Sequence, residues 1–167
     1  LYMVNSQWNN NICLSLSMIG VRDNNQYYAV NNIFANNNNS CGNIFSWKGA
    51  TTATVSSIYL KNTGAYASLY YVESNTKGFD ILPKLYWNDV VPEYKVFEDG
   101  LIPQSGLYFW SYAYFTLLQA DMRENTAYSG LTTSYSGQII LYDCTFSDHT
   151  IVGAGVLGTL SRARREP

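Results

Sequence analysis

The feature that most constrains this chain is an alternation of apolar and polar residues that recurs from its first residues to its last. Residues 12–21, for example, place Ile12, Leu14, Leu16 and Met18 at alternate positions. An alternation with period two is typical of a β-strand that buries one face. Clusters of Asn, Asp and Gly separate the runs, and these residues favour turns. The sequence therefore predicts an all-β chain.

About ten strands are expected, and no segment has the pattern of an amphipathic helix, although residues 119–125 could form one helical turn. Short strands at regular spacing indicate a sandwich or a barrel. We expect an antiparallel, jelly-roll-like β-sandwich over residues 1–160, followed by a basic flexible tail over residues 161–167. The expected strands cover residues 1–8, 12–21, 27–34, 43–47, 53–61, 65–73, 79–87, 94–97, 107–119, 138–146 and 150–160.

Two Asn-containing segments mark expected turns. Asn62-Thr63-Gly64 has the composition of a compact β-hairpin turn. Residues 36–40 read Asn-Asn-Asn-Asn-Ser, and we expect so polar a segment to form a surface loop outside the core.

The composition excludes several classes of function. Charged residues make up 13% of the chain, about half the usual share, whereas aromatic residues reach 16%. The net charge is −2, and only ten Lys and Arg are present, so we expect no nucleic-acid partner. No apolar run approaches the roughly 18 residues of a membrane span. The first residues lack a basic segment and the layout of a signal peptide, and they read as the start of a mature or processed chain.

Two short motifs fit a secreted protein. Asn38-Asn39-Ser40 is a glycosylation sequon, with Asn38 as the acceptor. In the tail, Arg162, Arg164 and Arg165 form an Arg-x-Arg-Arg pattern of the kind that proprotein convertases read, although an ordinary basic tail would look the same. We therefore expect an extracellular location.

The three cysteines, Cys13, Cys41 and Cys144, do not have the spacing of common zinc sites. Three buried free thiols and one disulfide with one free thiol both stay open at this point. Neither reading implies a metal ion or another cofactor.

The sequence offers little support for catalysis. His149 is the only histidine, and no Gly-x-Ser-x-Gly nucleophile elbow accompanies it. Cys144 lies five residues before His149, so on a strand the two would point to opposite faces. We expect His149 to be a surface residue at a strand end and the chain not to be an enzyme. Loop carboxylates could pair for glycoside hydrolysis or bind calcium, but no recognisable calcium loop is present, and solvated surface charges are the simpler interpretation. These acidic residues are Glu93, Glu98, Asp99, Asp121, Glu124, Asp143 and Asp148.

Four aromatic residues, Tyr108, Trp110, Tyr112 and Tyr114, alternate along the expected strand 107–119 and would share one face. A continuous face of large rings usually marks an interaction surface, and Tyr and Trp often anchor interfaces. We expect this face to lie in or beside a subunit interface. An exposed row of rings that binds sugars is the alternative.

Several local patterns resemble the tumour necrosis factor ligands and the globular heads of complement recognition proteins. Residues 101–108 (Leu-Ile-Pro-Gln-Ser-Gly-Leu-Tyr) resemble the approach to the central strand of that superfamily, and residues 1–7 resemble the same strand again. Residues 60–64 and 151–157 are similar to the hairpin and the closing strand of the family. The order departs from that of one ordinary member, since residues 1–75 read like a back half and residues 85–160 like a front half. A permuted domain or a piece of a tandem precursor would explain this order.

The resemblance implies a jelly roll, a Cys13–Cys41 disulfide that ties two loops, and assembly into a trimer, with Cys144 free or bonded between chains. It also implies a function without catalysis, in which a secreted oligomer presents a surface to an unknown protein partner. A carbohydrate-binding module, or the receptor-binding head of a viral or appendage fibre, is the alternative function.

Overall fold

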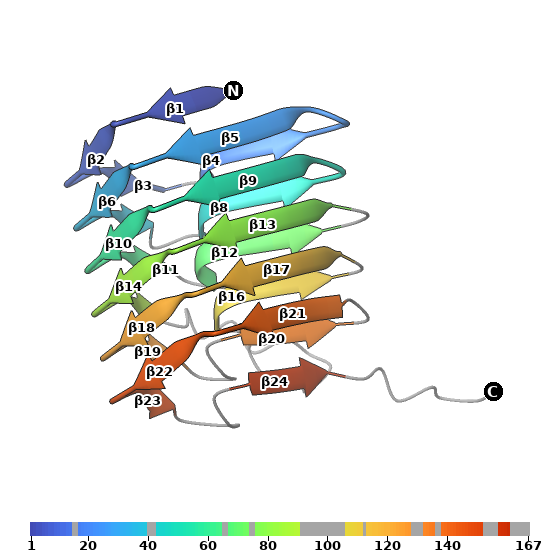
Figure 1. The fold of residues 1–167 in the computed structure, drawn as a ribbon. Coiled ribbons are helices and arrows are strands. Elements are labelled where there is room, and N and C mark those ends of the chain that lie inside the picture. Colours follow the sequence, from blue (N-terminus) through green and yellow to red (C-terminus); the bar gives the residue numbers. More distant parts are fainter. Residues whose placement is uncertain are drawn as a thin grey trace, which may run out of the picture.

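A computed structural model describes residues 1–14, 17–39, 43–64, 67–73, 76–90, 106–111, 113–127, 132–135, 138–151 and 157–160. Every regular element in these residues is a β-strand, so the predicted all-β class is confirmed. Figure 1 shows the chain winding as a solenoid, in which successive coils lie one below the other from the N-terminus down. Among the described residues, no helix is long and apolar enough to span a membrane.

Each coil contributes one strand to each of four sheets, which we name A to D, and each sheet has six strands. Sheet A contains β1 (Tyr2–Val4), β5 (Gln26–Val30), β9 (Thr51–Val55), β13 (Lys77–Ile81), β17 (Tyr114–Leu118) and β21 (Gln138–Tyr142). Sheet B contains β2 (Gln7–Asn9), β6 (Ile33–Ala35), β10 (Ile58–Leu60), β14 (Lys84–Tyr86), β18 (Asp121–Arg123) and β22 (Thr145–Ser147).

The other two sheets complete the wall of the solenoid. Sheet C contains β3 (Ile12–Cys13), β7 (Asn38–Asn39), β11 (Thr63–Gly64), β15 (Asp89–Val90), β19 (Thr126–Ala127) and β23 (Thr150–Ile151). Sheet D contains β4 (Ser17–Arg22), β8 (Asn43–Lys48), β12 (Ala67–Glu73), β16 (Gly106–Ser111), β20 (Thr132–Tyr135) and β24 (Leu157–Leu160).

The antiparallel jelly-roll sandwich expected from the sequence is wrong. Every strand pair in the described part of the chain is parallel. Tyr2 lies opposite Tyr28, and Tyr28 lies opposite Ala53, so a strand meets its neighbour only after a whole coil. A period-two pattern describes which side of a strand is buried in either kind of sheet, and it therefore does not distinguish them.

The expectation of about ten strands is wrong, because the described residues form 24 shorter ones. Left-handed corners explain why the expected long strands are split. Each corner is a residue whose backbone has a positive φ. In every coil one corner residue ends the strand of sheet A, and a second ends the strand of sheet B. Asn and Asp fill half of these positions because they tolerate positive φ better than other L-residues. The first set is Asn5, Asn31, Ser56, Leu82, Gln119 and Asp143, and the second is Asn10, Asn36, Lys61, Trp87, Glu124 and Asp148.

These corners overturn two further expectations. Asn62-Thr63-Gly64 forms no hairpin, because it follows the corner at Lys61 and continues into the parallel strand β11. Residues 119–125 contain no helical turn, because a corner at Gln119 leads directly into β18.

An asparagine ladder runs down the inside of the solenoid, one residue after the second corner. Its members are Asn11, Asn37, Asn62, Asn88 and Asn125, with His149 at the last position. The backbone N–H of each asparagine donates to the side chain of the next member below it, at 2.8–3.2 Å. The amide nitrogens of Asn37, Asn62, Asn88 and Asn125 also donate to backbone carbonyls of the coil above.

The ladder corrects the expectation that residues 36–40 form a surface loop. Asn37 is 1% exposed, and Asn39 is fully buried. Buried amides are tolerated there because the ladder bonds satisfy the donors and acceptors of Asn37. His149, expected at the surface, is half-buried at the foot of the same ladder.

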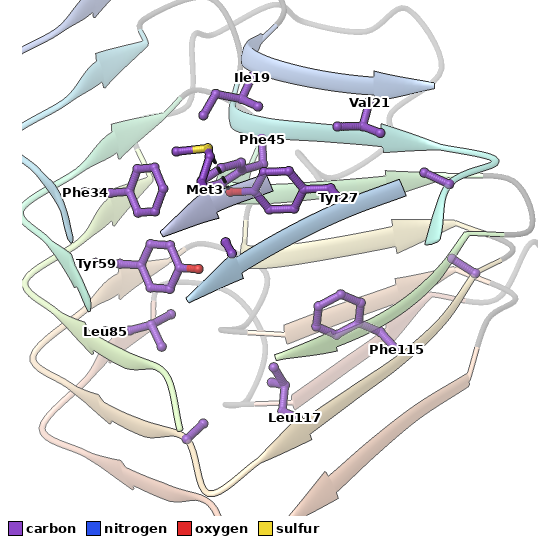
Figure 2. Packing of buried hydrophobic residues seen from close by; sticks show 14 of the residues in the cluster. Met3, Ile19, Val21, Tyr27, Phe34, Phe45, Tyr59, Leu85, Phe115 and Leu117 are labelled. Atoms are coloured by element: carbon purple, nitrogen blue, oxygen red, sulfur yellow. Dashed lines mark hydrogen bonds between the residues drawn. The ribbon is translucent and has the colours of Figure 1, made fainter. Parts of the chain in front are cut away.

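The apolar core lies between the sheets, and Figure 2 shows its largest side chains pointing inward from neighbouring coils. In sheet B one inward column reads Trp8, Phe34, Tyr59, Leu85, Met122 and Phe146. The rings of Phe34 and Tyr59 stack with centroids 5.5 Å apart. Burying side chains of this size contributes about 1.5–3 kcal/mol each, so this column is a principal source of stability.

The coils have nearly constant length with one exception. Along sheet A, neighbouring strands are offset by 26, 25, 26, 37 and 24 residues, from the register pairs 2/28, 28/53, 53/79, 79/116 and 116/140. The long coil contains residues 91–105, which lie outside the described residues, between β15 and β16.

Candidate interaction surface

Only one of the four aromatic residues expected on a shared face can be placed with its side chain. The single strand expected over residues 107–119 is wrong, because β16 ends at Ser111 in sheet D and β17 starts at Tyr114 in sheet A. Tyr108 and Trp110 lie in β16, but the structure describes only their backbone, and Tyr112 lies outside the described residues. Tyr114 is 56% exposed on sheet A.

The other predicted site residues are described only in part. Cys13 is half-buried, with its Sγ 3.7 Å from the carbonyl oxygen of Ser17, whereas Cys41 lies outside the described residues, so the disulfide stays a prediction. Asn38 is exposed in β7, as an acceptor for glycosylation must be, although Ser40 of the sequon is not described. The processing residues Arg162, Arg164 and Arg165 are also outside the described part.

The outer side of sheet A carries the most continuous apolar surface of the described residues. Its inward residues are buried, apart from the partly buried Ile139 and Leu141 of β21, and the residues between them form two outward columns in register. One column is Tyr2, Tyr28, Ala53, Phe79, Thr116 and Ile140, and the other is Val4, Val30, Val55, Ile81, Leu118 and Tyr142. We call these twelve residues the apolar face.

The apolar face has a uniform chemistry. Eleven of its twelve residues are hydrophobic, Thr116 is the exception, and none is charged. Several are well exposed, including Tyr2 at 74%, Tyr142 at 66% and Phe79 at 46%. Five strand spacings make the face about 24 Å long. Tyr114 lies beside it, in a neighbouring outward column that also contains Lys77.

Outward columns in the described parts of sheets B and C are more polar. In sheet C the outward column is Ile12, Asn38, Thr63, Asp89, Thr126 and Thr150. In sheet B the outward columns contain Lys84, Asp121 and Arg123 in the lower coils. The apolar face is therefore a property of sheet A and does not extend to the whole exterior.

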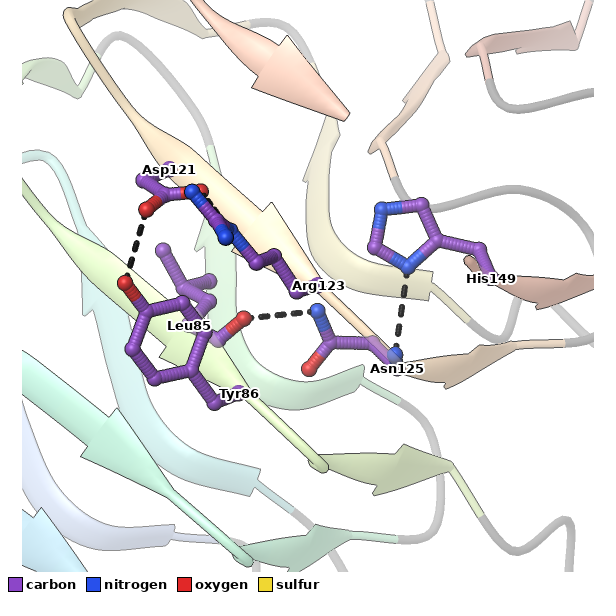
Figure 3. Close-up of polar contacts among 6 residues, drawn as sticks. All are labelled: Leu85, Tyr86, Asp121, Arg123, Asn125 and His149. Carbon is purple, nitrogen blue, oxygen red and sulfur yellow. Dashed lines mark hydrogen bonds and ion pairs between the residues drawn. The ribbon is translucent and has the colours of Figure 1, made fainter. Parts of the chain in front are cut away.

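A polar cluster occupies the lower part of sheet B, as Figure 3 shows. Asp121 accepts hydrogen bonds from the Arg123 guanidinium and the Tyr86 hydroxyl, both at 2.7 Å. The bond from Arg123 is the main reason that the pKa of Asp121 lies below its usual value. Removal from water, followed by the bond to Asp121, raises the pKa of Tyr86.

Trp87, at the corner beside this cluster, is 45% exposed. Its indole N–H donates to Glu124 at 2.7 Å, and the Lys61 ammonium lies 5.9 Å from the centre of its ring. Asp121 and Glu124 thus bond to neighbouring donors in the structure.

The remaining catalytic and metal alternatives gain no support in the described residues. No group of three His, Cys, Asp or Glu residues in that part of the chain could hold a metal ion, which removes the calcium site drawn from Asp121, Glu124, Asp143 and Asp148. Glu93, Glu98 and Asp99 lie outside it. His149 accepts a hydrogen bond at Nδ1 from the backbone of Asn125, and burial lowers its pKa. This geometry gives His149 a structural position in the ladder (Figure 3).

One signal in the sequence could have revealed both the ladder and the apolar face. An aromatic or large apolar residue is followed three positions later by Asn in Phe34–Asn37, Tyr59–Asn62 and Leu85–Asn88. These pairs recur after 25 and 26 residues, which is the length of one coil. If the sequence is written in rows of one coil length, the residues of each outward column fall at the same position in successive rows.

Comparison with known proteins gives no family. No protein-family model matches the chain, and no curated protein matches it.

Proposed function

We propose that this chain is a non-catalytic binding module that holds a partner protein against the apolar face of sheet A. The observation that carries the proposal is the continuity of two in-register apolar columns on an exposed wall. Exposed apolar patches of this extent usually mark an interaction surface. The expected extracellular location and trimer are compatible with this function, and they rest on the sequence alone.

The chemistry of the apolar face favours a protein over a glycan. Sugar binding needs several hydrogen-bonding groups around a flat ring, to match the hydroxyls of the ligand. Here the polar atoms of the side chains are limited to Thr116 and the hydroxyls of three tyrosines. A partner with an uncharged, apolar surface would lose little on leaving water and would gain contact along the whole face.

The wall is also rigid, which favours affinity. Parallel pairing fixes every strand of sheet A to two neighbours, apart from the two edge strands. The residues between the outward columns are locked in the core, as the buried Ala29, Thr54 and Leu117 show. A surface held in its binding geometry loses little conformational entropy when a partner binds.

Charge placed at the centre of the apolar face tests this function. Phe79→Lys lies mid-face, and Thr126→Lys on the outward column of sheet C is the matched control. We expect the binding of the uncharged apolar dye Nile red to fall several-fold in F79K and to stay at the wild-type level in T126K. Proteins captured by the wild type and by T126K should be lost from F79K. Equal dye binding and equal capture by all three would contradict the proposal.

A glycan site at the Trp87 corner is the second candidate function. The exposed indole ring of Trp87, with Glu124, Lys61 and Tyr86 around it, offers both a flat surface for stacking and polar groups at its edge. Glycan-array binding that disappears in Trp87→Ala and persists in F79K would favour this candidate. The absence of any array signal would exclude it.

A further inference from the structure

The apolar face is uneven, because its first column mixes large and small side chains. From the first strand of sheet A to the last, that column reads Tyr2, Tyr28, Ala53, Phe79, Thr116 and Ile140. Phe79, which is 46% exposed, therefore projects between two smaller side chains, those of Ala53 and Thr116. A second surface fits such a column closely only if it sets small side chains opposite the large ones.

We infer that the partner of the apolar face is a second copy of this chain, packed face to face about a two-fold axis. The axis runs parallel to the strands of sheet A and passes between β9 and β13. A rotation about this axis preserves position along a strand and reverses the order of the strands. Each column therefore faces the same column of the other copy. The inference rests on the proposed function, because it names the partner protein of the same face.

The two-fold sets large side chains opposite small ones. Because the strand order is reversed, Phe79 of each copy faces Ala53 of the other. By the same rule Tyr28 faces Thr116. In the second column a smaller residue likewise faces a larger one, since Val55 faces Ile81 and Val30 faces Leu118. Two packed sheets lie about 10 Å apart with interdigitated side chains, and the matched sizes allow that packing over β5, β9, β13 and β17.

Other two-fold arrangements match less well. An axis through β13 sets Phe79 against Phe79 of the other copy, and it sets Ala53 against Thr116. An axis along the solenoid pairs Phe79 with Ile81, and it pairs Ala53 with Val55. Both arrangements join large to large and small to small, so the small residues lose dispersion contacts. An axis between β13 and β17 engages only four of the six described strands of sheet A.

No like charges meet in the outward columns that this contact joins. The apolar face itself has no charged residue, and the outward column beside it has one, Lys77. That column reads Gln26, Thr51, Lys77, Tyr114 and Gln138. The two-fold sets Lys77 opposite Thr51, so the ammonium faces a hydroxyl. It sets Tyr114 opposite Gln26, so the phenol faces an amide. An apolar centre with a polar rim is the usual make-up of a protein interface.

The size of the contact indicates a weak, reversible dimer. The face is about 24 Å long, and three outward columns about 6.6 Å apart make it about 13 Å wide between backbone positions. With the breadth of the side chains, each copy contributes about 500 Å², for a total near the lower limit of about 1,000 Å² for a specific interface. We therefore expect dissociation at micromolar concentration. A two-fold contact uses the same face of both copies, so assembly stops at two.

Size changes at the centre of the contact test the inference by sedimentation equilibrium. The wild type should dimerise as its concentration rises. Ala53→Phe sets ring against ring and should weaken the dimer about tenfold or more, although it adds apolar surface that would strengthen a nonspecific association. Phe79→Ala should also weaken it, whereas the double variant A53F/F79A exchanges the two sides of the pair and should restore it. Thr126→Phe adds a ring on sheet C and is the matched control, which should dimerise like the wild type.

Disulfide formation locates the axis independently of affinity. Cysteines that face each other between two packed sheets can form a disulfide. An equimolar mixture of Tyr28→Cys and Thr116→Cys should therefore give a mixed covalent dimer on oxidation. Neither variant should do so alone, because the two copies of one position lie three strand spacings apart, about 14 Å, which is too far for a disulfide. Equal yields from the mixture and from either variant alone would overturn the two-fold.

The possible outcomes separate this inference from the proposed function. A wild type that is monomeric at all concentrations overturns the pairing of two copies, as does a trimer or an A53F dimer tighter than that of the wild type. If such a wild type still captures proteins that F79K loses, the apolar face keeps its role in binding a different protein. Circular dichroism checks that each variant folds. If A53F does not fold, the yield of the mixed disulfide decides.

Discussion

Removing one amide from the middle of the asparagine ladder should destabilise the solenoid far more than removing the amide at its end. Asn62 is fully buried, and its Oδ1 accepts from the backbone and the side chain of Asn37, at 3.2 and 2.9 Å. Its Nδ2 donates to the Phe34 carbonyl at 2.8 Å and to Asn88 Oδ1 at 3.0 Å. Asn62→Ala leaves two Asn37 N–H groups without partners and removes one hydrogen bond from the Phe34 carbonyl, while Asn88 Oδ1 keeps the bond from the Asn62 backbone.

Each buried group without a partner costs about 1–3 kcal/mol, so the two Asn37 N–H groups should make Asn62→Ala lower the free energy of unfolding by roughly 2–6 kcal/mol. Asn11→Ala is the control. The Asn11 side chain donates one ladder bond, to Asn37, and is partly exposed, so the loss should stay below about 1 kcal/mol. Urea unfolding followed by circular dichroism measures both, with amide exchange to detect coils that open separately. Equal losses in the two variants would refute the account of the ladder.

Three further substitutions test other parts of the fold. His149→Asn should raise stability by about 1 kcal/mol, because an amide suits the ladder better than an imidazole whose buried Nε2 lacks a well-formed hydrogen bond. Burial lowers the pKa of His149 from its ordinary 6.5, so the contribution of the neutral imidazole to wild-type stability should be complete above pH 6.5 and be lost as the pH falls below it. The urea midpoint of unfolding, measured against pH, should fall less in H149N than in the wild type. Leu82→Asn should add about 1 kcal/mol in urea unfolding, because Leu82 holds a positive φ that Asn tolerates better. Gly78→Ala should lower the thermal midpoint, at a cost of about 1–3 kcal/mol, because a Cβ there overlaps the Phe115 ring, and an unchanged midpoint would contradict this packing.

The sequence predicts the all-β class correctly because that class depends on local chemistry. Residues such as Tyr27 and Ala29, or Phe115 and Leu117, alternate with outward neighbours and are buried as their pattern indicates. The pairing partner is not a local property. Tyr28 lies opposite Ala53, which comes 25 residues later, and nothing within β5 itself distinguishes that partner from an antiparallel one nearby.

The structural role of asparagine was the hardest to predict from the sequence. Asn36 at a corner, Asn37 in the ladder and Asn38 on the outer wall have three different roles within one run of identical side chains. A local interpretation treats the run as a loop, because buried amides are costly unless every polar atom has a partner. The partners of Asn37 lie one coil away on either side, so they appear only when the chain is compared at the coil spacing.

The candidate surface escaped prediction for the same reason. Residues 107–119 contain the densest aromatic run, but a change of sheet divides them between sheets D and A. The apolar face instead takes two residues from each of six coils, such as Phe79 and Ile81 from β13. No short window contains more than one strand of it.

Distances along one outward column test the solenoid most directly. Spin labels at Tyr28 paired with Phe79, Thr116 or Ile140 span two, three and four coils. Electron paramagnetic resonance measures the distance between the two labels of each pair. After correction for the length of the label side chains, that distance should rise by about 4.8 Å per coil and reach roughly 19 Å between Tyr28 and Ile140. The step from Phe79 to Thr116 covers 37 residues but should add no more than the others. A larger increase across that step, or separations that do not rise in coil order, would contradict the parallel solenoid.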